Sequence, residues 1–316
     1  MTEHDRTAQD RTADDALDDV HAERRRLLSL AYRMTGTVSD AEDVVQETYL
    51  RWYRLDPGER AAVRVPAAWL TRVASRVALD HLGSARVRRE THAGQWLPEP
   101  VPADLFAGTA AVTTLGGGPA PDPLDRVTLD ESVSTALLTL LEAMTPAERV
   151  AFVLHDVFGL PFDEIAEVVG RSPAATRQLA ASARRHVREG RRARVGSGEH
   201  DRVVRAFLDA SVGGDLARLL RVLAPDVELR ADGGGVVQAA PNAVRGPDHV
   251  ARFLLGVLAK QPSLRFEEEQ TADGLGYAMR LDGRLFGIVT FAVDAGRVTR
   301  VWLVVDPRKL SRWERA

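Results

Sequence analysis

The stretch 145–194 constrains the fold most, because it carries helical apolar patterns joined by a glycine. Phe162, Ile165 and Val169 recur at the spacing of one helix face and predict a short helix. Gly170 follows at once, and glycine tolerates the positive φ that a tight turn needs. A further apolar helix is predicted just before this one. Together with the helix after the turn, the segment predicts a helix-turn-helix.

The helix after the turn carries an arginine-rich face. Ser172 is placed to cap its N-terminus, and Pro173 suits the first helical position, where a missing N–H costs nothing. Leu179, Ala183 and Val187 form its buried stripe. Its other faces carry Arg177, Gln178, Arg184, Arg185 and Arg188. Arg and Gln can bond base edges in a major groove, so DNA binding is favoured over a helical hairpin with a solvated basic face.

The totals of the chain exclude several classes of protein. It has no cysteine, which excludes disulfides, zinc–thiolate sites and thiol redox chemistry and fits a reducing cytoplasm. The acidic N-terminus is unlike a signal peptide, and no apolar run approaches the roughly 20 residues of a membrane helix. At 316 residues and a formal net charge of −3, we expect two or three cytoplasmic domains with no membrane partner, metal or cofactor.

An acidic helix is predicted shortly after Gly36. Ser39 and Glu42 have the spacing of a capping box, which predicts the start of the helix. One of its faces forms an apolar stripe of Ala41, Val45, Thr48 and Trp52. Its first turns are crowded with Asp40, Glu42, Asp43, Gln46 and Glu47. Carboxylates there suit the positive end of the helix dipole, and they equally suit an acidic docking face; the residues alone leave both open.

The sign of the charge reverses in the next helix, which is predicted to start near Pro66. Between Arg64 and Glu90 the chain carries the basic side chains Arg64, Arg72, Arg76, His81, Arg86, Arg88 and Arg89. Such a run is an electrostatic footprint for phosphates. Alone, a solvated charge run is the more frequent explanation. Beside a helix-turn-helix in the same chain, nucleic acid becomes the better hypothesis.

Two segments resemble a known family. LLSLAYRMTGTVSDAEDVVQETYLRWY followed by AAWLTRVASRVALDHLGSAR resembles region 2 of extracytoplasmic-function sigma factors of bacterial RNA polymerase. TPAERVAFVLHDVFG, FDEIAEVVG and SPAATRQLAASARRHVR are similar, in that order, to region 4 of the same family. The resemblance covers most of 24–190 and implies a dissociable polymerase subunit, which directs transcription to particular promoters and is not an enzyme.

The resemblance assigns roles to particular positions. It implies contacts with the β′ clamp helices of core polymerase, or supports for them, at Asp40, Glu42, Asp43, Gln46, Glu47 and Trp52. It implies recognition and opening of the −10 element by Arg72, Arg76, Asp80, Arg86, Arg88 and Arg89. It implies reading of the −35 element by Ser172, Ala175, Thr176, Arg177, Gln178, Arg184 and Arg185, with the β flap as the polymerase partner of region 4. Arg76 stands where many members carry Asn.

The stretch 92–126 is rich in Pro and Gly and has little periodicity, which predicts an irregular, flexible tether. Within it, Trp96 begins a WLPEP sequence, and a Trp in a Pro-rich loop is usually an anchor. WLPEP also resembles a motif of the sigma factors that carry a SnoaL-like C-terminal extension. This resemblance predicts such a domain further along the chain.

The stretch 199–310 has the pattern of that domain. Helices come first, and strands follow at 264–268, at 276–281 and in a hairpin over 284–304, which predicts an α+β fold with a curved antiparallel sheet. Residues 286–293 are apolar on both faces of the strand, so both faces are expected to be covered. The order resembles a SnoaL-like, nuclear-transport-factor-2-like cone.

Short sequences in this domain resemble the signatures of that subgroup. DGGG at 232–235 is similar to DGGGK with Val236 in place of Lys, and DPRKL at 306–310 is similar to NPDKL. The resemblance implies regulation in cis, with contacts at Trp96, Leu97, Pro98, Asp232, Gly233, Gly234, Gly235, Asp306, Pro307 and Leu310. Whether the domain also binds a small molecule stays open.

The predicted chain is therefore multidomain, with two all-α domains and an α+β cone. Its parts are a tail (1–18), region 2 (19–91), the linker (92–126), region 4 (127–194), the SnoaL-like domain (199–310) and a second tail (311–316). One alternative is a helix-turn-helix regulator with a ligand-binding domain. A less favoured one is a SnoaL-type enzyme with a DNA-binding appendage, for which Asp232 and His249 are the candidate acid–base residues.

Overall fold

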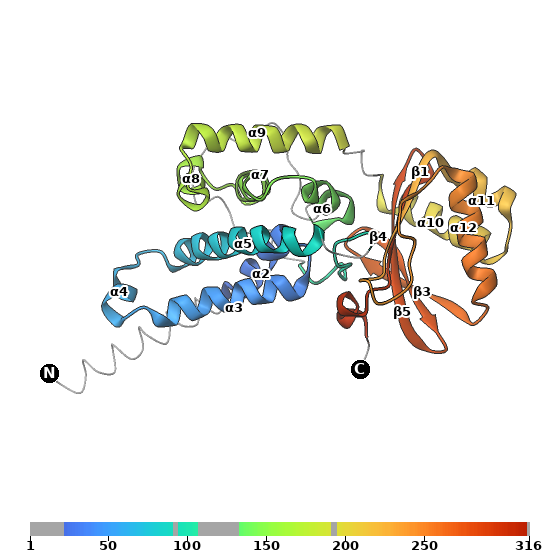
Figure 1. Cartoon of the computed structure of the whole chain (residues 1–316), viewed down its shortest axis with the longest axis horizontal. Coiled ribbons are helices and arrows are strands. Elements are labelled where there is room, and N and C mark those ends of the chain that lie inside the picture. Colours follow the sequence, from blue (N-terminus) through green and yellow to red (C-terminus); the bar gives the residue numbers. More distant parts are fainter. Residues whose placement is uncertain (1–21, 91–93, 107–132, 191–194, 315–316) are drawn as a thin grey trace. The chain divides into compact units, whose positions relative to one another are not determined.

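Two units of the chain, each with its own core, are seen in the computed structural model (Figure 1). The structure describes residues 22–90, 94–106, 133–190 and 195–314, without the side chains of 85–90. The described residues of the first unit are 22–84 and Thr145–Ser182. Those of the second are 85–90, 94–106, 133–144, 183–190 and 195–314. The predicted tail 1–18 lies outside the described residues.

The first unit begins with four helices. They are α2 (Arg24–Thr35), α3 (Val38–Arg54), α4 (Pro57–Ala62) and α5 (Pro66–Glu90). Gly36 ends α2 in the left-handed conformation at φ 80°. The N-cap of α3 is Thr37, whose hydroxyl accepts the Asp40 N–H at 3.2 Å. The capping box predicted at Ser39 and Glu42 is therefore wrong, because Thr37, two residues before Ser39, is the N-cap and α3 has already begun at Val38.

The apolar stripe predicted on α3 is confirmed, because Ala41, Val45, Thr48 and Trp52 are all buried. The Trp52 ring packs edge-on against Trp69 of α5, with their centroids 5.2 Å apart. A second contact joins α2 to α5, where the buried Arg26 guanidinium donates to the Thr71 hydroxyl at 2.9 Å. These helices therefore share one core.

The helix-turn-helix follows the predicted pattern closely. It comprises α7 (Pro146–Phe152), the π-helix η3 (Val153–Val157), α8 (Phe162–Val169) and α9 (Pro173–Gly190). Gly170 ends α8 at φ 68°, and the Ser172 hydroxyl accepts the Ala175 N–H at 3.2 Å, as an N-cap does. The wider π turn was not predicted. One more helix, α6 (Thr135–Glu142), lies in the second unit.

The second unit contains a six-stranded sheet in the order β2-β1-β6-β5-β4-β3. Its strands are β1 (Leu223–Asp232), β2 (Val244–Arg245), β3 (Leu264–Thr271), β4 (Gly274–Leu281), β5 (Arg284–Asp294) and β6 (Arg297–Val304). The sheet is mixed, since β1 pairs with β6 in parallel. The expectation of a purely antiparallel sheet is wrong here because a long connection, including a helix, lets distant strands run parallel.

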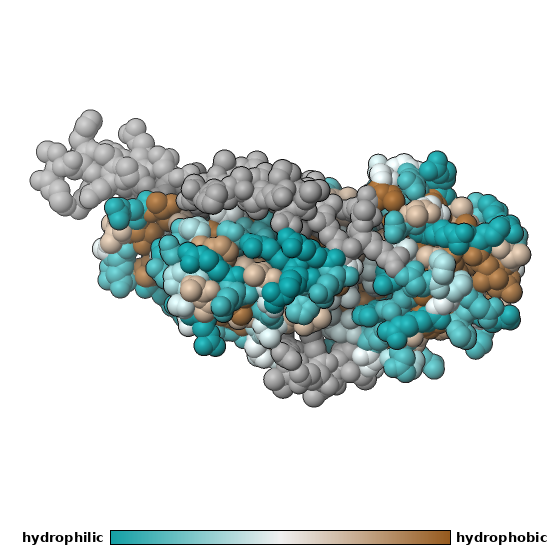
Figure 2. Space-filling model, turned by 90° about the horizontal axis from the view of Figure 1, so that it is seen from above, coloured by the Kyte–Doolittle hydropathy of each residue, from teal (hydrophilic) through white to brown (hydrophobic). Residues whose placement is uncertain are grey.

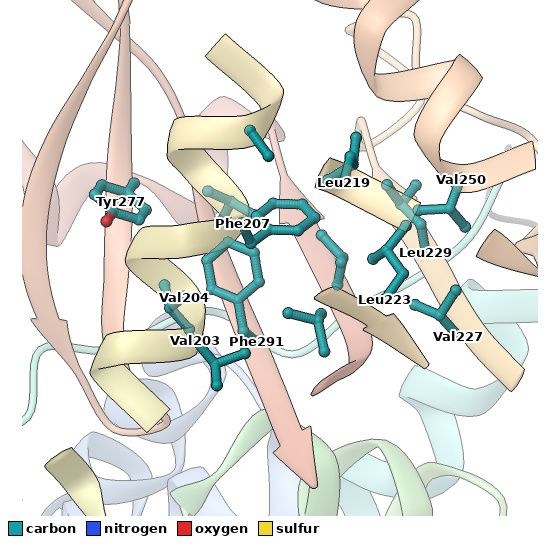
Figure 3. Close-up of a cluster of buried hydrophobic side chains, with 14 of the residues drawn as sticks. Val203, Val204, Phe207, Leu219, Leu223, Val227, Leu229, Val250, Tyr277 and Phe291 are labelled. Atoms are coloured by element: carbon teal, nitrogen blue, oxygen red, sulfur yellow. The ribbon is translucent and has the colours of Figure 1, made fainter. Parts of the chain in front are cut away.

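One face of this sheet is covered by helices, as Figure 1 shows. These are α10 (Ser197–Val212), α11 (Leu216–Val222) and α12 (Pro247–Lys260). Between helices and sheet, Phe207 and Phe291 meet edge to face with centroids 5.2 Å apart, and Tyr277 packs on Phe291 (Figure 3). Aromatic side chains are thus part of the buried core between the helices and the sheet.

The opposite face is covered by part of the predicted linker and by the segment that follows β6. Leu97, Leu310 and Trp313 pack there against Ile288 of β5 and Trp302 of β6. This confirms the prediction that both faces of β5 are covered. The predicted tail 311–316 is corrected as far as 314, because η5 (Ser311–Trp313) is a 3-10 helix that buries its indole ring.

The linker is corrected as well. Within 94–106, Leu97, Val101 and Phe106 are buried, so this part is no free tether. The Ala103 N–H donates to the Gln270 carbonyl and the Ala272 N–H to the Val101 carbonyl, both at 3.0 Å. The prediction of a flexible tether is wrong for 94–106, because backbone polar groups of this segment form hydrogen bonds with the edge of the sheet. The residues 107–126 of the predicted linker lie outside the described part.

Phe291→Ala should destabilise the packing of the helices on the sheet. Removing a buried phenylalanine costs about 3–5 kcal/mol, so amides of β5 and β6 should exchange with solvent at least about a hundredfold faster. Hydrogen–deuterium exchange of the full chain measures this. Val212→Ala, at a side chain that is 61% exposed, is the control and should leave those rates within about threefold. Unchanged protection in Phe291→Ala would contradict the packing described.

Candidate functional sites

The exposed face of α3 is the first candidate site. Asp43 and Gln46 are exposed there, while Asp40, Glu42 and Glu47 are half-buried. Asp40 lies 3.1 Å from His81 Nε2, and Glu47 pairs with Arg51 at 2.8 Å. The sixth predicted position, Trp52, is buried and can only support this face from behind.

Two apolar side chains extend the same face. Leu50 and Tyr53 are each 43% exposed. They follow Asp43 and Gln46 at spacings of three and four residues, which places all four side chains along one side of the helix. The sequence analysis missed them because it searched this helix for buried apolar residues and for charge. Their spacing from the acidic positions was the available signal.

The exposed cations of α5 form the second candidate site. Arg72, Arg76 and Asp80 are exposed and follow one another at four-residue spacing, which is one helix face. Arg72 Nη1 lies 3.3 Å from Glu167 Oε2 of α8, and Arg76 Nη2 donates to the Glu167 carbonyl at 2.7 Å. The side chains of Arg86, Arg88 and Arg89 lie outside the described residues.

The third candidate site is the polar face of α9. Ser172, Arg177, Gln178 and Arg185 are exposed, and Ala175 and Arg184 are half-buried. Thr176 is different: it is fully buried, and its hydroxyl donates to the Ser172 carbonyl at 3.0 Å. Its prediction as a DNA contact is wrong, because residue 176 falls on the core side of the helix with Ala180 and Ala183.

The predicted regulatory motifs meet around one buried carboxylate. Asp232 Oδ2 accepts the Leu97 N–H at 2.9 Å and lies 2.7 Å from Lys309 Nζ. The same ammonium donates to the Leu97 carbonyl at 2.5 Å and lies 4.3 Å from the centre of the Trp96 ring. Asp232 and Lys309 are both buried, so the pair is shielded from water. We call Trp96, Leu97, Asp232 and Lys309 the linker clamp.

A second carboxylate fixes the glycine turn beside the clamp. Asp306 receives two bonds from the Arg308 guanidinium, at 3.0 and 2.8 Å. Burial alone raises the pKa of Asp306, but the bonds and charge of Arg308 outweigh it and hold the pKa below its usual value. Gly234, at φ 65°, passes so close that an added Cβ would lie 2.3 Å from the Asp306 carboxyl carbon. A side chain at 234 is therefore excluded.

The other predicted motif residues divide by exposure. Pro98 and Leu310 are buried, while Pro307 is exposed. Gly233 and Gly235 line a shallow pocket with the linker residue Gly94. Lys309, the lysine of DPRKL, was not among the predicted contacts, and its polar neighbours Arg308 and Ser311 gave no local signal of a buried partner.

The two acid–base candidates do not form a site. Both carboxylate oxygens of Asp232 accept hydrogen bonds, from the Lys309 ammonium and from the backbone N–H groups of Leu97 and Gly234. His249 is exposed on α12, with Nδ1 3.1 Å from the Arg245 carbonyl. Within the described residues there is no group of three or more His, Asp or Glu side chains that could hold a metal. No described helix is long and apolar enough to cross a membrane.

Comparisons with known proteins agree with this geometry. The model of Sigma-70 region 2 matches residues 20–88, that of Sigma-70 region 4 matches 134–187, and that of the SnoaL-like domain matches 204–306. The ECF RNA polymerase sigma factor SigJ of Mycobacterium tuberculosis is 41% identical over 293 residues, covering 92% of this chain and 88% of SigJ. The probable sigma factor SigI of the same species is 39% identical, covering 92% and 93%.

A solved structure resembles the whole chain. The crystal structure of M. tuberculosis SigJ superposes with a TM-score of 0.68 at 37% identity, covering 94% of this chain and 98% of that one. Fold and matches together define a transcription initiation factor of the sigma-70 class. The chain belongs to the extracytoplasmic-function RNA polymerase sigma factors, in a form that carries a SnoaL-like domain. This confirms the family and fold class expected from the sequence.

Lys309→Met should release the linker. The substitution leaves Asp232 buried without its cation, which costs about 3–5 kcal/mol, so the Leu97 amide should exchange at least about a hundredfold faster. The matched control is Lys260→Met, the same change at an exposed lysine at the end of α12. Hydrogen–deuterium exchange of the full chain reads both. Equal Leu97 exchange in the two variants would contradict the clamp.

Proposed function

We propose that this sigma factor divides promoter recognition among three helix faces. The exposed face of α3 binds the β′ clamp helices of core polymerase, and α5 contacts the −10 element. The polar face of α9 reads the −35 element, with region 4 resting on the β flap. A factor of this kind acts in the cytoplasm, where bacterial polymerase meets the chromosome. The observation that carries the proposal is the exposed face of α3.

The composition of that face favours a protein partner. Acidic residues alone would be satisfied by solvent, but Leu50 and Tyr53 expose apolar surface beside Asp43 and Gln46. Protein interfaces combine aromatic anchors with a polar rim. The coloured part of the face shown in Figure 2 is mainly hydrophilic, with smaller groups of hydrophobic residues.

Tyr53→Ala should weaken core binding. Loss of an anchor typically costs more than about 1 kcal/mol, so the dissociation constant for sigma-free core polymerase should rise at least about fivefold. Run-off transcription from a responsive promoter should fall in parallel and recover at higher factor concentration. Val212→Ala removes an exposed apolar side chain from the other unit and should change neither quantity. Wild-type core affinity in both Tyr53→Ala and Leu50→Ala would refute α3 as the core-binding face.

We further propose that the SnoaL-like domain regulates the factor in cis through α6. Region 4 begins at 134 by its family match, so α6 is its first helix. Asp273, in the turn between β3 and β4, accepts the Thr135 N–H at 2.8 Å and the Thr135 hydroxyl at 2.6 Å. Both residues are buried. A carboxylate at this end of a helix also meets the positive end of its dipole, which strengthens the contact.

The surroundings of α6 support the same proposal. The end of α9 packs against it, since a Cβ added to Gly190 would lie 2.3 Å from Leu140 Cδ2. The turn that carries Asp273 also bonds the linker through Ala272 and Val101. One hairpin turn of the SnoaL-like domain thus contacts both the linker and the first helix of region 4.

Asp273→Ala should change transcription without changing core affinity. It removes two hydrogen bonds to a buried carboxylate, so α6 is expected to detach, and run-off output at saturating factor should shift at least about twofold. Thr135→Val should shift output in the same direction. Thr139→Val is the control, because the hydroxyl of this second α6 threonine donates to the Thr135 carbonyl within the same helix. Output equal to wild type in Asp273→Ala would refute regulation through this contact.

A further inference from the structure

The ring of Phe162, the first residue of α8, is contacted by two side chains of the helix-turn-helix. The guanidinium carbon of Arg177 lies 5.6 Å from the centre of this ring. The imidazole of His155 stacks on it, with centroids 4.0 Å apart and planes inclined by 27°. Phe162 is half-buried, whereas Arg177 is exposed on α9. The ring thus lies between the scaffold and a cation on the DNA-facing helix.

The ring is itself held in place. His155 belongs to the π-helix η3, and its Nδ1 lies 2.9 Å from the Leu160 carbonyl. Single π turns within helices recur at functional sites, where they alter the direction of a side chain. Here the turn brings His155 over Phe162. Backbone, imidazole and phenyl ring therefore form a continuous support that ends at Arg177.

A supported arginine has an advantage in reading a base. An exposed arginine populates many rotamers, and these are lost when the guanidinium docks on a guanine edge. Attraction between a cation and the face of an aromatic ring restricts the arginine before DNA arrives. Less entropy is then lost on binding, and the gain applies only to the base that the arginine contacts.

We propose that Phe162 is a positioning residue that orients Arg177 and so sets −35 specificity without touching DNA. The inference rests on the proposed role of α9 in reading the −35 element. It adds to that role a determinant on the preceding helix, outside the recognition helix itself. Gln178, the neighbouring candidate, has no such contact with Phe162 in the described structure and serves as the internal reference.

The test uses holoenzyme and a library of promoters randomised in the −35 element. Arg177→Ala and Gln178→Ala first define which base position each residue reads. Phe162→Leu, which keeps an apolar side chain but removes the ring face, should lower base discrimination at the Arg177 position about two- to fivefold, the range expected for an exposed cation–π contact. Discrimination at the Gln178 position should be unchanged. Phe162→Tyr, which keeps the ring, should behave as wild type.

A double-mutant cycle completes the test. Phe162→Leu should have no further effect at the Arg177 position once Arg177 is alanine, and it should be additive with Gln178→Ala. An equal loss at both base positions would show a general structural role and overturn the inference, as would no loss at either. If Arg177→Ala itself leaves −35 preference unchanged, the proposed role of α9 fails and the inference with it. Unchanged discrimination at the Gln178 position shows that the helix-turn-helix of Phe162→Leu is folded.

Discussion

The structure of the second unit depends on one buried carboxylate. Asp232 is removed from water and is compensated by the Lys309 ammonium and by the backbone N–H groups of Leu97 and Gly234. Removing either charge leaves the other buried and uncompensated, which is far more costly than never burying the pair. Since the bonds come from the linker, the glycine turn and the C-terminal segment, these three parts must form together.

The buried Asp232–Lys309 pair explains why both faces of the sheet are covered. The helices α10, α11 and α12 cover one face. The other face is covered by side chains that the clamp brings to it, among them Leu97 and Trp313, and the Trp313 indole N–H donates to the Pro100 carbonyl at 2.8 Å. The linker that follows region 2 is thus structurally part of the SnoaL-like domain over 94–106.

Much of this architecture was predictable because its signals are local. The stripe on α3, the glycine after α8 and the alternation in β5 each follow from residues within a few positions of one another. Among the residues predicted to read the −35 element, Thr176 is buried on the core side of α9, because assignment by resemblance ignored which side of the helix the residue occupies.

The failures have a common physical cause. Lys309 bonds Leu97 across 212 positions of sequence, and no local pattern encodes such a contact. A stretch rich in Pro and Gly lacks periodicity whether it is free or docked, so its composition suggested a tether. Asp273 and Thr135 were missed for the same reason, since a turn carboxylate is ordinary until its distant partner is known. The parallel pairing of β1 with β6 also depends only on the tertiary fold.

Docking of the linker is the central claim, and a disulfide tests it directly. Pro102 and Thr271 face each other as antiparallel partners that form no backbone hydrogen bond with each other. The Cα atoms of such a non-hydrogen-bonded pair lie about 4.5 Å apart, which a disulfide can span. The chain has no cysteine, so Pro102→Cys with Thr271→Cys introduces the only two thiols. Mild oxidation of the native protein should form the disulfide in nearly all molecules. In the control pair, Asp104→Cys with Thr271→Cys, most molecules should keep two free thiols. Closure no faster than in that control, or closure only after unfolding, would show that the linker is free.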